Sequence, residues 1–353
     1  MTRVLTKDHK QLNSYLKATS EWISEETLSS FPDAEPKEYL YDLMRNYSQR
    51  GGKHFRPALV LLCCELFGGD PEDALNSAVA LELFHNFALI HDDIEDDSLL
   101  RRGEPTLHLQ HGTALALNSG DALLALVHEI LLDNNSRLSS TLSLRIHRHL
   151  NKVMRATFEG QALDIGWVAK KIFPNRGEYR DMIGKKTGWY SGKGPCQCGA
   201  LIAGASESEL ETVGRFGKAI GIGFQVRDDL LNLTENSENI APSANAGGYG
   251  KERGGDIAEG KRTLITIELL DRLSESDAER LRSILLSERE QILNSDIDWC
   301  IARAESTGAL EAAAIYCEKQ AYQATMALED LPEHPAKAML IELVDYLTID
   351  RKA

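Results

Sequence analysis

Helical periodicity runs through almost the whole of this 353-residue chain. Apolar side chains recur every three to four positions, which is the repeat of a helix with one buried face. Alternating patterns typical of strands are scarce, and no Asn-Gly pair marks a tight hairpin. The pattern predicts an all-α fold. The candidate helices cover 8–30, 36–50, 55–67, 71–98, 113–133, 136–170, 178–203, 207–233, 262–273, 276–293, 296–305, 308–328 and 334–350.

Nothing in the sequence divides these helices into separate units. We find no repeat of fixed period and no low-complexity linker, and the longest glycine-rich polar segment covers only about 234–260. With 42% hydrophobic residues, the chain can bury a substantial core. We therefore expect a single domain over residues 1–353, although a chain of this length also allows two.

The overall charge limits the classes of partner. Lys and Arg number 39 against 54 Asp and Glu, a formal net charge of −15. This balance argues against a nucleic-acid partner, which needs a basic surface. The N-terminus has no apolar core of signal-peptide type, and no stretch approaches the roughly 18 apolar residues of a membrane span. We therefore expect a cytoplasmic protein.

The six cysteines show no spacing typical of a zinc site. Cys196 and Cys198 are the one pair close enough in sequence to suggest a soft metal, and this is a weak signal. We expect free thiols.

The candidate helix 71–98 is apolar on most sides but carries a polar stripe. The stripe consists of Glu82, His85, Leu89, Asp92 and Asp96. Its steps of three and four residues place these side chains on one face, over about 21 Å. Because neighbouring like charges repel, a cation is expected at the acidic end, and a divalent metal ion fits best. A solvated acidic helix end is the alternative.

A second polar stripe lies in the segment GIGFQVRDDLLN. Its members are Gly221, Gln225, Asp228 and Asn232, with Asp229 beside them. Surface ion pairing with Arg227 explains these carboxylates equally well when they are considered alone. Two helices that each present aspartates also suit Mg²⁺, which binds through one or two carboxylates together with substrate phosphates.

Basic residues occur in short clusters suited to phosphate. These are Lys53 with Arg56 in GGKHFRP, Arg101 with Arg102, Lys185 with Lys186 before Thr187, and Lys261 with Arg262. The first begins a candidate helix after glycines, a natural anion site, but lacks the spacing of a P-loop. Any one cluster alone is most often solvated surface. Four clusters and two carboxylate stripes together predict two phosphate-bearing ligands, one bridged by metal and one held by basic side chains.

In this order the motifs resemble the trans-isoprenyl diphosphate synthases (polyprenyl synthetases), with geranylgeranyl diphosphate synthases closest in pattern. The resemblance covers roughly residues 40–350 and rests on GGKHFRP, LELFHNFALIHDDIEDDSLLRRGEPTLH, GQALD, KKTGWY, FQVRDDLLN and GGDIAEGKRT. It implies a helical bundle around a deep central cavity, dependence on Mg²⁺, and a homodimer. The implied activity is that of a prenyltransferase, which condenses isopentenyl diphosphate head-to-tail with an allylic diphosphate.

The resemblance also implies residue roles. The metal ligands would be Asp92, Asp96 and Asp228, with Asp93 in support. The allylic diphosphate would be bound by Arg101, Lys186, Thr187, Gln225 and Lys261. Isopentenyl diphosphate would be bound by Lys53, Arg56, His85 and Arg102. The catalytic residues would be Asp92, Asp96, Arg101, Lys186, Asp228 and Lys261, with Gln161 and Asp164 supporting the site and Lys251 and Asp256 closing it.

Three features depart from the family pattern. His54 stands where an arginine is commoner, and Asn232 stands in place of the last aspartate of the second motif. The loss of that carboxylate is expected to weaken one metal position. The segment Gly188–Gly194 is unusually rich in glycine, and the sequence offers no reason for it.

Product length is predicted from the residues that precede Asp92. Phe87 lies five residues earlier, roughly 7.5 Å along the helix, and Ala88 lies four earlier. The small residue leaves a channel open, and Phe87, together with Phe84, would form its floor. In this family the combination resembles geranylgeranyl diphosphate synthases. A farnesyl or longer-chain synthase remains the alternative, as does an ordinary core role for both rings.

Two rival functions are weaker. A class I terpene cyclase has no use for a second diphosphate pocket, so Lys53, Arg56 and Arg102 argue against it. A non-catalytic partner subunit would be expected to lack the first aspartate motif, which is intact here.

Overall fold

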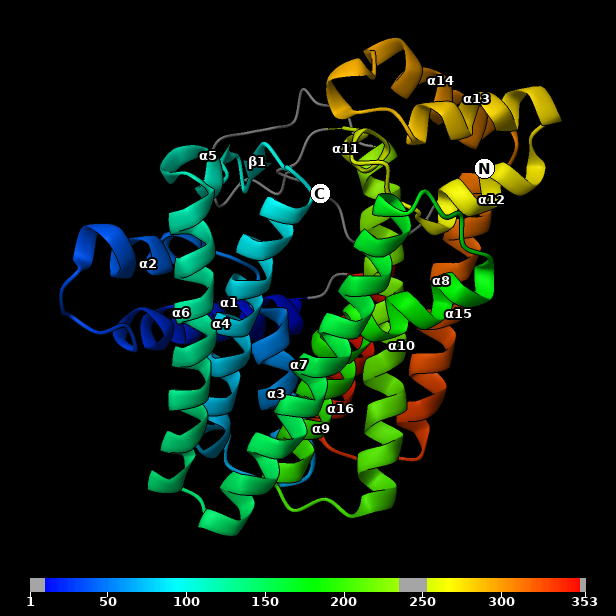
Figure 1. Cartoon of the computed structure of the whole chain (residues 1–353). Helices are drawn as coiled ribbons and strands as arrows, with labels where there is room; N and C mark the ends of the chain where they lie inside the picture. Colours follow the sequence, from blue (N-terminus) through cyan, green and yellow to red (C-terminus); the bar gives the residue numbers. More distant parts are fainter. Residues whose placement is uncertain (1–9, 235–252, 350–353) are drawn as a thin grey trace.

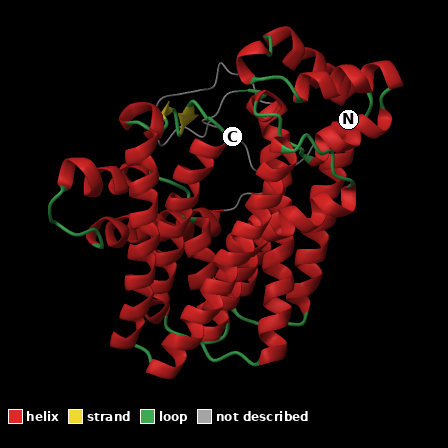
Figure 2. Cartoon of the chain, viewed as in Figure 1, coloured by secondary structure: helices red, strands yellow, loops and turns green. Residues whose placement is uncertain are grey.

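The computed structural model describes residues 10–234 and 253–349, and within these ranges it is almost entirely helical (Figure 2). The predicted all-α fold is confirmed. The α-helices are α1 (Lys10–Ser29), α2 (Asp42–Gln49), α3 (Phe55–Leu66), α4 (Pro71–Glu95), α5 (Leu107–His111), α6 (Thr113–Asp133), α7 (Ser140–Ala169), α8 (Arg176–Ile183), α9 (Gly194–Ile202), α10 (Glu207–Thr234), α11 (Gly255–Ala258), α12 (Leu264–Arg272), α13 (Glu275–Leu285), α14 (Asn294–Ser306), α15 (Ala309–Glu329) and α16 (Pro335–Thr348). Two π-helices, η1 (Lys37–Tyr41) and η3 (Gly184–Lys193), two 3₁₀ turns, η2 (Asn134–Ser136) and η5 (Arg289–Gln291), and the short strands β1 (Leu100–Arg101) and β2 (Glu104–Pro105) complete the described part.

The long helices α4, α6, α7, α10 and α15 run side by side along the bundle, and α11 to α14 gather at one end (Figure 1). Buried apolar side chains form two clusters in the described residues. The larger cluster lies among α3, α4, α6, α9 and α16, and the smaller one lies around α8 and α12 to α14. Helices α10 and α15 contribute to both clusters. The single domain over residues 1–353 stays a prediction.

Helix α4 holds the acidic stripe in place because it is capped at its start and packed in the core. Asp70 caps its first turn by accepting a hydrogen bond from the Glu72 N–H, and Pro71 occupies the first helical position, as predicted. The helix is buried over most of its length, including Leu83 and Phe84. Its acidic C-terminal end is therefore fixed by a core helix and not by a surface loop.

Several predicted boundaries were wrong for local reasons. The expected helix 178–203 consists of α8, η3 and α9, because the chain follows π-helical geometry from Gly184 to Lys193. The expected helix 136–170 begins only at Ser140, after Ser139 caps it. The expected helix 276–293 ends at Leu285.

The hairpin β1–β2 and the short helix α5 were not predicted. Leu100 pairs with Pro105 and Arg101 with Glu104. The turn between them is made by Arg102 and Gly103, with φ of 54° and 78°. Two successive left-handed residues form this type of turn without any Asn-Gly pair, which explains why the hairpin was missed.

Contacts between glycines account for the glycine-rich segment of η3. A Cβ on Gly192 would lie 1.8 Å from the Gly217 carbonyl oxygen, and a Cβ on Gly217 would lie 2.5 Å from the Gly192 oxygen. One helical turn further on, a Cβ on Gly221 would lie 3.0 Å from the Gly188 Cα. Helix η3 therefore approaches α10 with backbone against backbone, which brings the site residues of both helices together.

One segment of the described residues is long and apolar enough to cross a membrane by length and composition. It is Thr113–Ser136, with a mean hydropathy of 1.4 over its best window. The prediction that no stretch approaches a membrane span was therefore too strong. Residues Leu123, Val127 and Leu131 of this segment are fully buried in the larger cluster, where α6 packs against α4.

We expect Gly192→Ala to lower the free energy of unfolding by about 1–3 kcal/mol or more, because the new methyl group overlaps the backbone of α10. Gly166→Ala is the matched control, since a Cβ there meets nothing within 4 Å and α7 gains helix propensity. Urea denaturation of the two variants measures the difference. Equal stability of the two variants would contradict the close η3–α10 contact.

Candidate functional site

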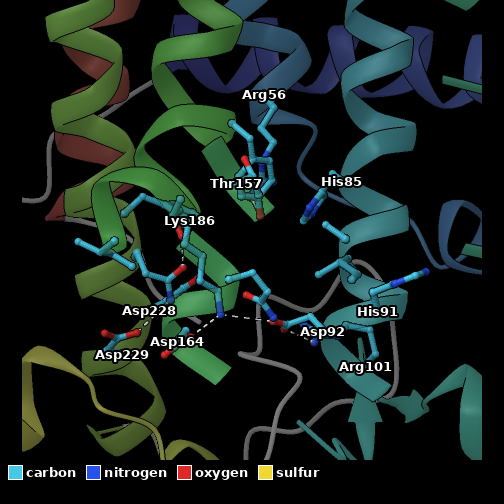
Figure 3. Close-up of a pocket in the computed structure, with 18 of the residues that line it drawn as sticks. Arg56, His85, His91, Asp92, Arg101, Thr157, Asp164, Lys186, Asp228 and Asp229 are labelled. Atoms are coloured by element: carbon cyan, nitrogen blue, oxygen red, sulfur yellow. Dashed lines mark hydrogen bonds and ion pairs between the residues drawn. The ribbon is translucent and has the colours of Figure 1, made fainter. Parts of the chain in front are cut away.

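A cavity of about 470 Å³ opens between α3, α4, α7, η3 and α10. The residues predicted from the sequence meet there from widely separated segments. The following line it: Lys53, Arg56, His85, Phe87, Ala88, Asp92, Arg101, Arg102, Lys186, Thr187, Gln225, Asp228 and Lys261. Among the described residues, Asp93, Asp96 and Phe84 were predicted for the site but do not line the cavity. Figure 3 shows Arg56 and His85 on one side of the open space and Asp92, Lys186 and Asp228 at another.

Lysines pair with the carboxylates of the first stripe. Lys186 Nζ lies 3.5 Å from Asp92 Oδ1, and Lys261 Nζ lies 2.7 Å from Asp96 Oδ2. Burial raises the pKa of Asp96 to about 7 against the opposing effect of Lys261, and the neighbouring Asp92 adds to the rise. The cation expected beside this stripe is thus supplied in part by the protein itself.

Helix α7 supports this arrangement through its GQALD segment. Asp164 Oδ2 lies 2.6 Å from Lys186 Nζ, so the ammonium group is shared between two aspartates (Figure 3). Gln161 donates one hydrogen bond to Asp92 Oδ1 at 3.1 Å and another to Glu95 at 2.6 Å. Gln161 and Asp164 therefore contact Asp92 and Lys186 directly, and their supporting role in catalysis stays a prediction.

Asp228 and Asp229 of the second stripe both line the cavity, and Asp229 is buried. Thr187 of η3 donates to Gln225 Oε1 at 3.1 Å, and the Gln225 amide donates to Asp229 Oδ1 at 3.0 Å. Tyr179 donates to the other oxygen of Asp229. Burial raises the pKa of Asp229 to about 8, and the nearby charge of Asp256 adds to the rise.

Asn232 has a structural role that its position in the motif did not reveal. Its side-chain oxygen accepts a hydrogen bond from the Asp256 N–H at 3.2 Å, and its carbonyl accepts one from the Gly254 N–H at 2.8 Å. The residue therefore anchors the start of α11. Asp256 Oδ1 in turn lies 3.7 Å from Lys261 Nζ. Lys251 and most of the predicted loop 234–260 lie outside the described residues.

The donor chemistry suits magnesium. Asp92, Asp96 and Asp228 supply carboxylate oxygens, which are the hard ligands that Mg²⁺ prefers. Within residues 10–234 and 253–349, no three His, Cys, Asp or Glu side chains already converge as a metal site. Magnesium commonly completes its shell with water and substrate phosphate, so a divided set of carboxylates fits a metal that arrives with a diphosphate.

The arginine pair is held by residues that the sequence analysis missed. Arg101 Nε lies 2.9 Å from Asp93 Oδ1, and Arg101 Nη2 approaches the same carboxylate more closely. Tyr47 of α2 donates to Asp93 Oδ2 at 2.6 Å. Arg102 Nη1 donates to the Tyr47 carbonyl at 2.7 Å. Asp93 is fully buried, and its partners here are Arg101 and Tyr47, not the metal support expected for it.

Arg50, which follows the last residue of α2, binds the hairpin that carries the arginine pair. Its guanidinium donates to the carbonyls of Arg101 and Pro105, each at 3.0 Å, and lies 4.6 Å from the centre of the Tyr47 ring. No periodic pattern marks Tyr47 or Arg50 in the sequence. The one available signal for such partners was Asp93. This carboxylate lies one position away from the stripe that faces the cavity and therefore needs a partner of its own.

The second basic cluster lies at the start of α3. Arg56 is buried, donates to the Ser191 and Tyr190 hydroxyls at 3.0 and 3.1 Å, and lies 4.5 Å from the centre of the Phe55 ring. Burial holds the pKa of His85 well below its usual range, and the charge of Arg56 adds to this effect. His85 is therefore neutral at neutral pH.

His54 connects this cluster to its surroundings. Its φ of 44° turns the glycine-rich segment into α3. Its Nδ1 lies 2.7 Å from the Ser20 hydroxyl of α1, and its Nε2 lies 3.7 Å from Glu82 Oε1. The histidine thus links α1 to the buried end of the acidic stripe.

The cysteines take no part in the cavity lining. All six are free, as predicted, and all six are buried. Burial raises the pKa of Cys198 to about 12, so its thiol stays protonated and is a poor metal ligand.

We expect Tyr47→Phe to lower stability by about 1.5–3 kcal/mol, because a buried hydrogen bond to a charged carboxylate is lost. Activity should fall as well, since Asp93 and Arg101 lose a fixed partner. Tyr39→Phe is the control, because Tyr39 is 59% exposed on η1. Urea denaturation and steady-state kinetics measure both effects, and wild-type values for Tyr47→Phe would contradict the positioning role.

Comparison with known proteins shows the family of the chain. A family model described as polyprenyl synthetase matches residues 37–302. The chain belongs to the polyprenyl synthetase family, and it is a prenyltransferase, as its motifs predicted.

Individual relatives match over nearly the whole chain. The chain is 36% identical over 335 residues to the short chain isoprenyl diphosphate synthase of Methanothermobacter thermautotrophicus, covering 94% of this chain and 96% of that protein. It is 34% identical to the geranylgeranyl diphosphate synthase of Methanosarcina mazei, covering 90% and 91%. The crystal structure of geranylgeranyl pyrophosphate synthetase from Pyrococcus horikoshii superposes with a TM-score of 0.85 at 31% identity, covering 97% and 99%.

Proposed function

We propose that this prenyltransferase condenses isopentenyl diphosphate with an allylic diphosphate in a magnesium-dependent reaction, and that its main product is geranylgeranyl diphosphate. One observation carries the proposal. A single cavity joins two separate basic clusters, a set of aspartates and an apolar wall that includes Phe87, Ala88 and Phe158. Two anionic substrates and one growing apolar tail require this combination.

Isopentenyl diphosphate is assigned to the cluster at the start of α3. Lys53, Arg56 and Arg102 supply positive charge, and neutral His85 supplies a hydrogen-bond donor. Arg56 reaches the cavity edge with its guanidinium already oriented by Ser191 and Tyr190. A pre-oriented guanidinium loses little freedom when it binds phosphate.

The allylic diphosphate is assigned to the opposite, acidic side. Lys186 and Lys261 supply ammonium groups there, and Thr187 and Gln225 supply hydrogen bonds. Asp92, Asp96 and Asp228 would hold Mg²⁺, which neutralises charge on the departing diphosphate when it is bound. Lys186 and Lys261 are then available to the diphosphate, where their charge stabilises the leaving group.

The remaining chemistry needs little from the protein. The allylic carbon loses its diphosphate, the alkene of isopentenyl diphosphate forms the new carbon–carbon bond, and a proton then leaves the adduct. The released pyrophosphate is a sufficient acceptor for that proton. His85 is not required as the base, and its neutral state suits binding.

We propose geranylgeranyl diphosphate as the product because Phe87 narrows the cavity five residues before Asp92 while Ala88 leaves space above it. The names of the relatives from Methanosarcina mazei and Pyrococcus horikoshii support this length. A farnesyl or longer-chain product is the alternative.

We also propose a homodimer. Helix α6 leaves Leu117 and Leu132 exposed on the side away from the core, at 44% and 55% of their full area. A second copy of the chain would cover such apolar side chains. A cytoplasmic location stays a prediction.

The direct test is to incubate the protein with Mg²⁺, isopentenyl diphosphate and dimethylallyl, geranyl or farnesyl diphosphate. Mass spectrometry should detect geranylgeranyl diphosphate as the main product. Absence of elongation with all three primers would contradict the synthase proposal.

We expect Asp92→Asn to reduce prenyl transfer on the order of 100- to 1,000-fold, because one carboxylate oxygen for the metal is lost. Asp97→Asn is the matched control in the same acidic run. Asp97 faces His108 at 3.7 Å with its side chain 69% exposed, and its φ of 50° suits asparagine. Steady-state rates compare the two variants. A similar loss in both would contradict the assignment of Asp92.

Phe87→Ala should lengthen the main product by at least one isoprene unit, since it removes the ring that narrows the cavity. Product chain length is measured by mass spectrometry with the wild-type protein run alongside. An unchanged distribution would remove Phe87 from this role.

A further inference from the structure

The side chains at the apolar end of the cavity differ from those expected from the sequence. Phe84 was expected to help form the floor, but it is fully buried and does not line the cavity. Its ring lies behind Phe87, with centres 5.6 Å apart, and meets the Tyr190 ring edge-on at 5.9 Å. Phe84 is therefore a support and has no surface that a prenyl chain can touch.

A different ring occupies the exposed position. Phe158 of α7 lines the cavity and retains 42% of its accessible area. Its ring meets the Phe87 ring edge-on at 5.8 Å and the Phe84 ring edge-on at 6.0 Å. Phe158 thus faces the phenylalanines of α4 from a different helix, α7. No sequence motif indicated this residue.

Phe87 itself is fixed from its other side. The centres of the His91 and Phe87 rings lie 4.5 Å apart. A Cβ on Gly120 of α6 would lie 2.4 Å from His91 Nε2, so this glycine makes the space in which the imidazole lies. Because Phe87 is held between neighbours, it has little freedom to swing aside for a growing chain. The width of the passage is then decided by the ring that faces it.

We propose that Phe158 is a specificity-determining residue for product length, forming with Phe87 the closing pair of the elongation channel. The inference rests on the proposed synthase function and deepens it, because it assigns the limit on product chain length to side chains of two helices, α4 and α7. The part of the prenyl chain that reaches this pair is apolar, and removing a phenyl ring from Phe158 opens apolar volume directly in its path.

The test uses the full-length protein with Mg²⁺, isopentenyl diphosphate and farnesyl diphosphate, with products sized by mass spectrometry. Phe158→Ala should move the main product to a length at least one isoprene unit longer than the wild type. Phe158→Trp should increase the share of shorter products. Both variants should fold, since the side chain is partly exposed, and a melting curve checks this.

Two matched variants separate the channel from general effects. Leu144→Ala removes another exposed apolar side chain from α7, 52% exposed and outside the cavity lining, and should leave the distribution unchanged. Phe84→Ala should lower the melting temperature, because it removes a buried ring.

The outcomes distinguish the two proposals. If the wild-type protein elongates no primer, the synthase function fails. If the wild type elongates and Phe158→Ala gives the same lengths, or no greater change than Leu144→Ala, the assignment of Phe158 is overturned while the synthase function stands.

Discussion

Two partly buried lysine–aspartate pairs are the interaction on which the site depends. Asp92 and Asp96 would repel each other at the end of a core helix, and burial alone would favour the neutral form of Asp96. Lys186 and Lys261 offset that repulsion from η3 and from the segment after α11. Each pair joins parts of the chain that are distant in sequence, so the acidic end of α4 organises the whole cavity. A bound metal ion would take over the same electrostatic task.

The backbone contact between η3 and α10 makes one of these pairs possible. Lys186 and Thr187 belong to the π-helix, and they reach the second stripe because Gly192 and Gly217 carry no side chain between the two backbones. On the other side of the cavity, Asp93 binds Arg101 and thereby fixes the hairpin that follows α4. The acidic run thus contains the proposed metal ligand Asp92 and the buried anchor Asp93, and a single helix positions the two groups one residue apart.

Much of this could be predicted from the sequence. The helical class followed from periodicity, and the stripes of α4 and α10 followed from steps of three and four residues, because helix geometry is local. What could not be predicted depends on contacts between distant segments. Tyr47 and Arg50 have no periodic signature. The close approach of η3 to α10, the burial of Phe84 and the exposure of Phe158 all depend on neighbouring helices. The product length and the metal therefore stay proposals.

We propose that the carboxylates of α4 and α10 receive a divalent metal while the lysines turn to the diphosphate. This proposal is tested most directly by a crystal structure with Mn²⁺ and a non-reactive allylic diphosphate analogue, using anomalous scattering to locate the metal. We expect Mn²⁺ beside Asp92 and Asp228, with Lys186 and Lys261 contacting the diphosphate. Metal bound elsewhere, or lysines still paired with Asp92 and Asp96 while the analogue is bound, would contradict it.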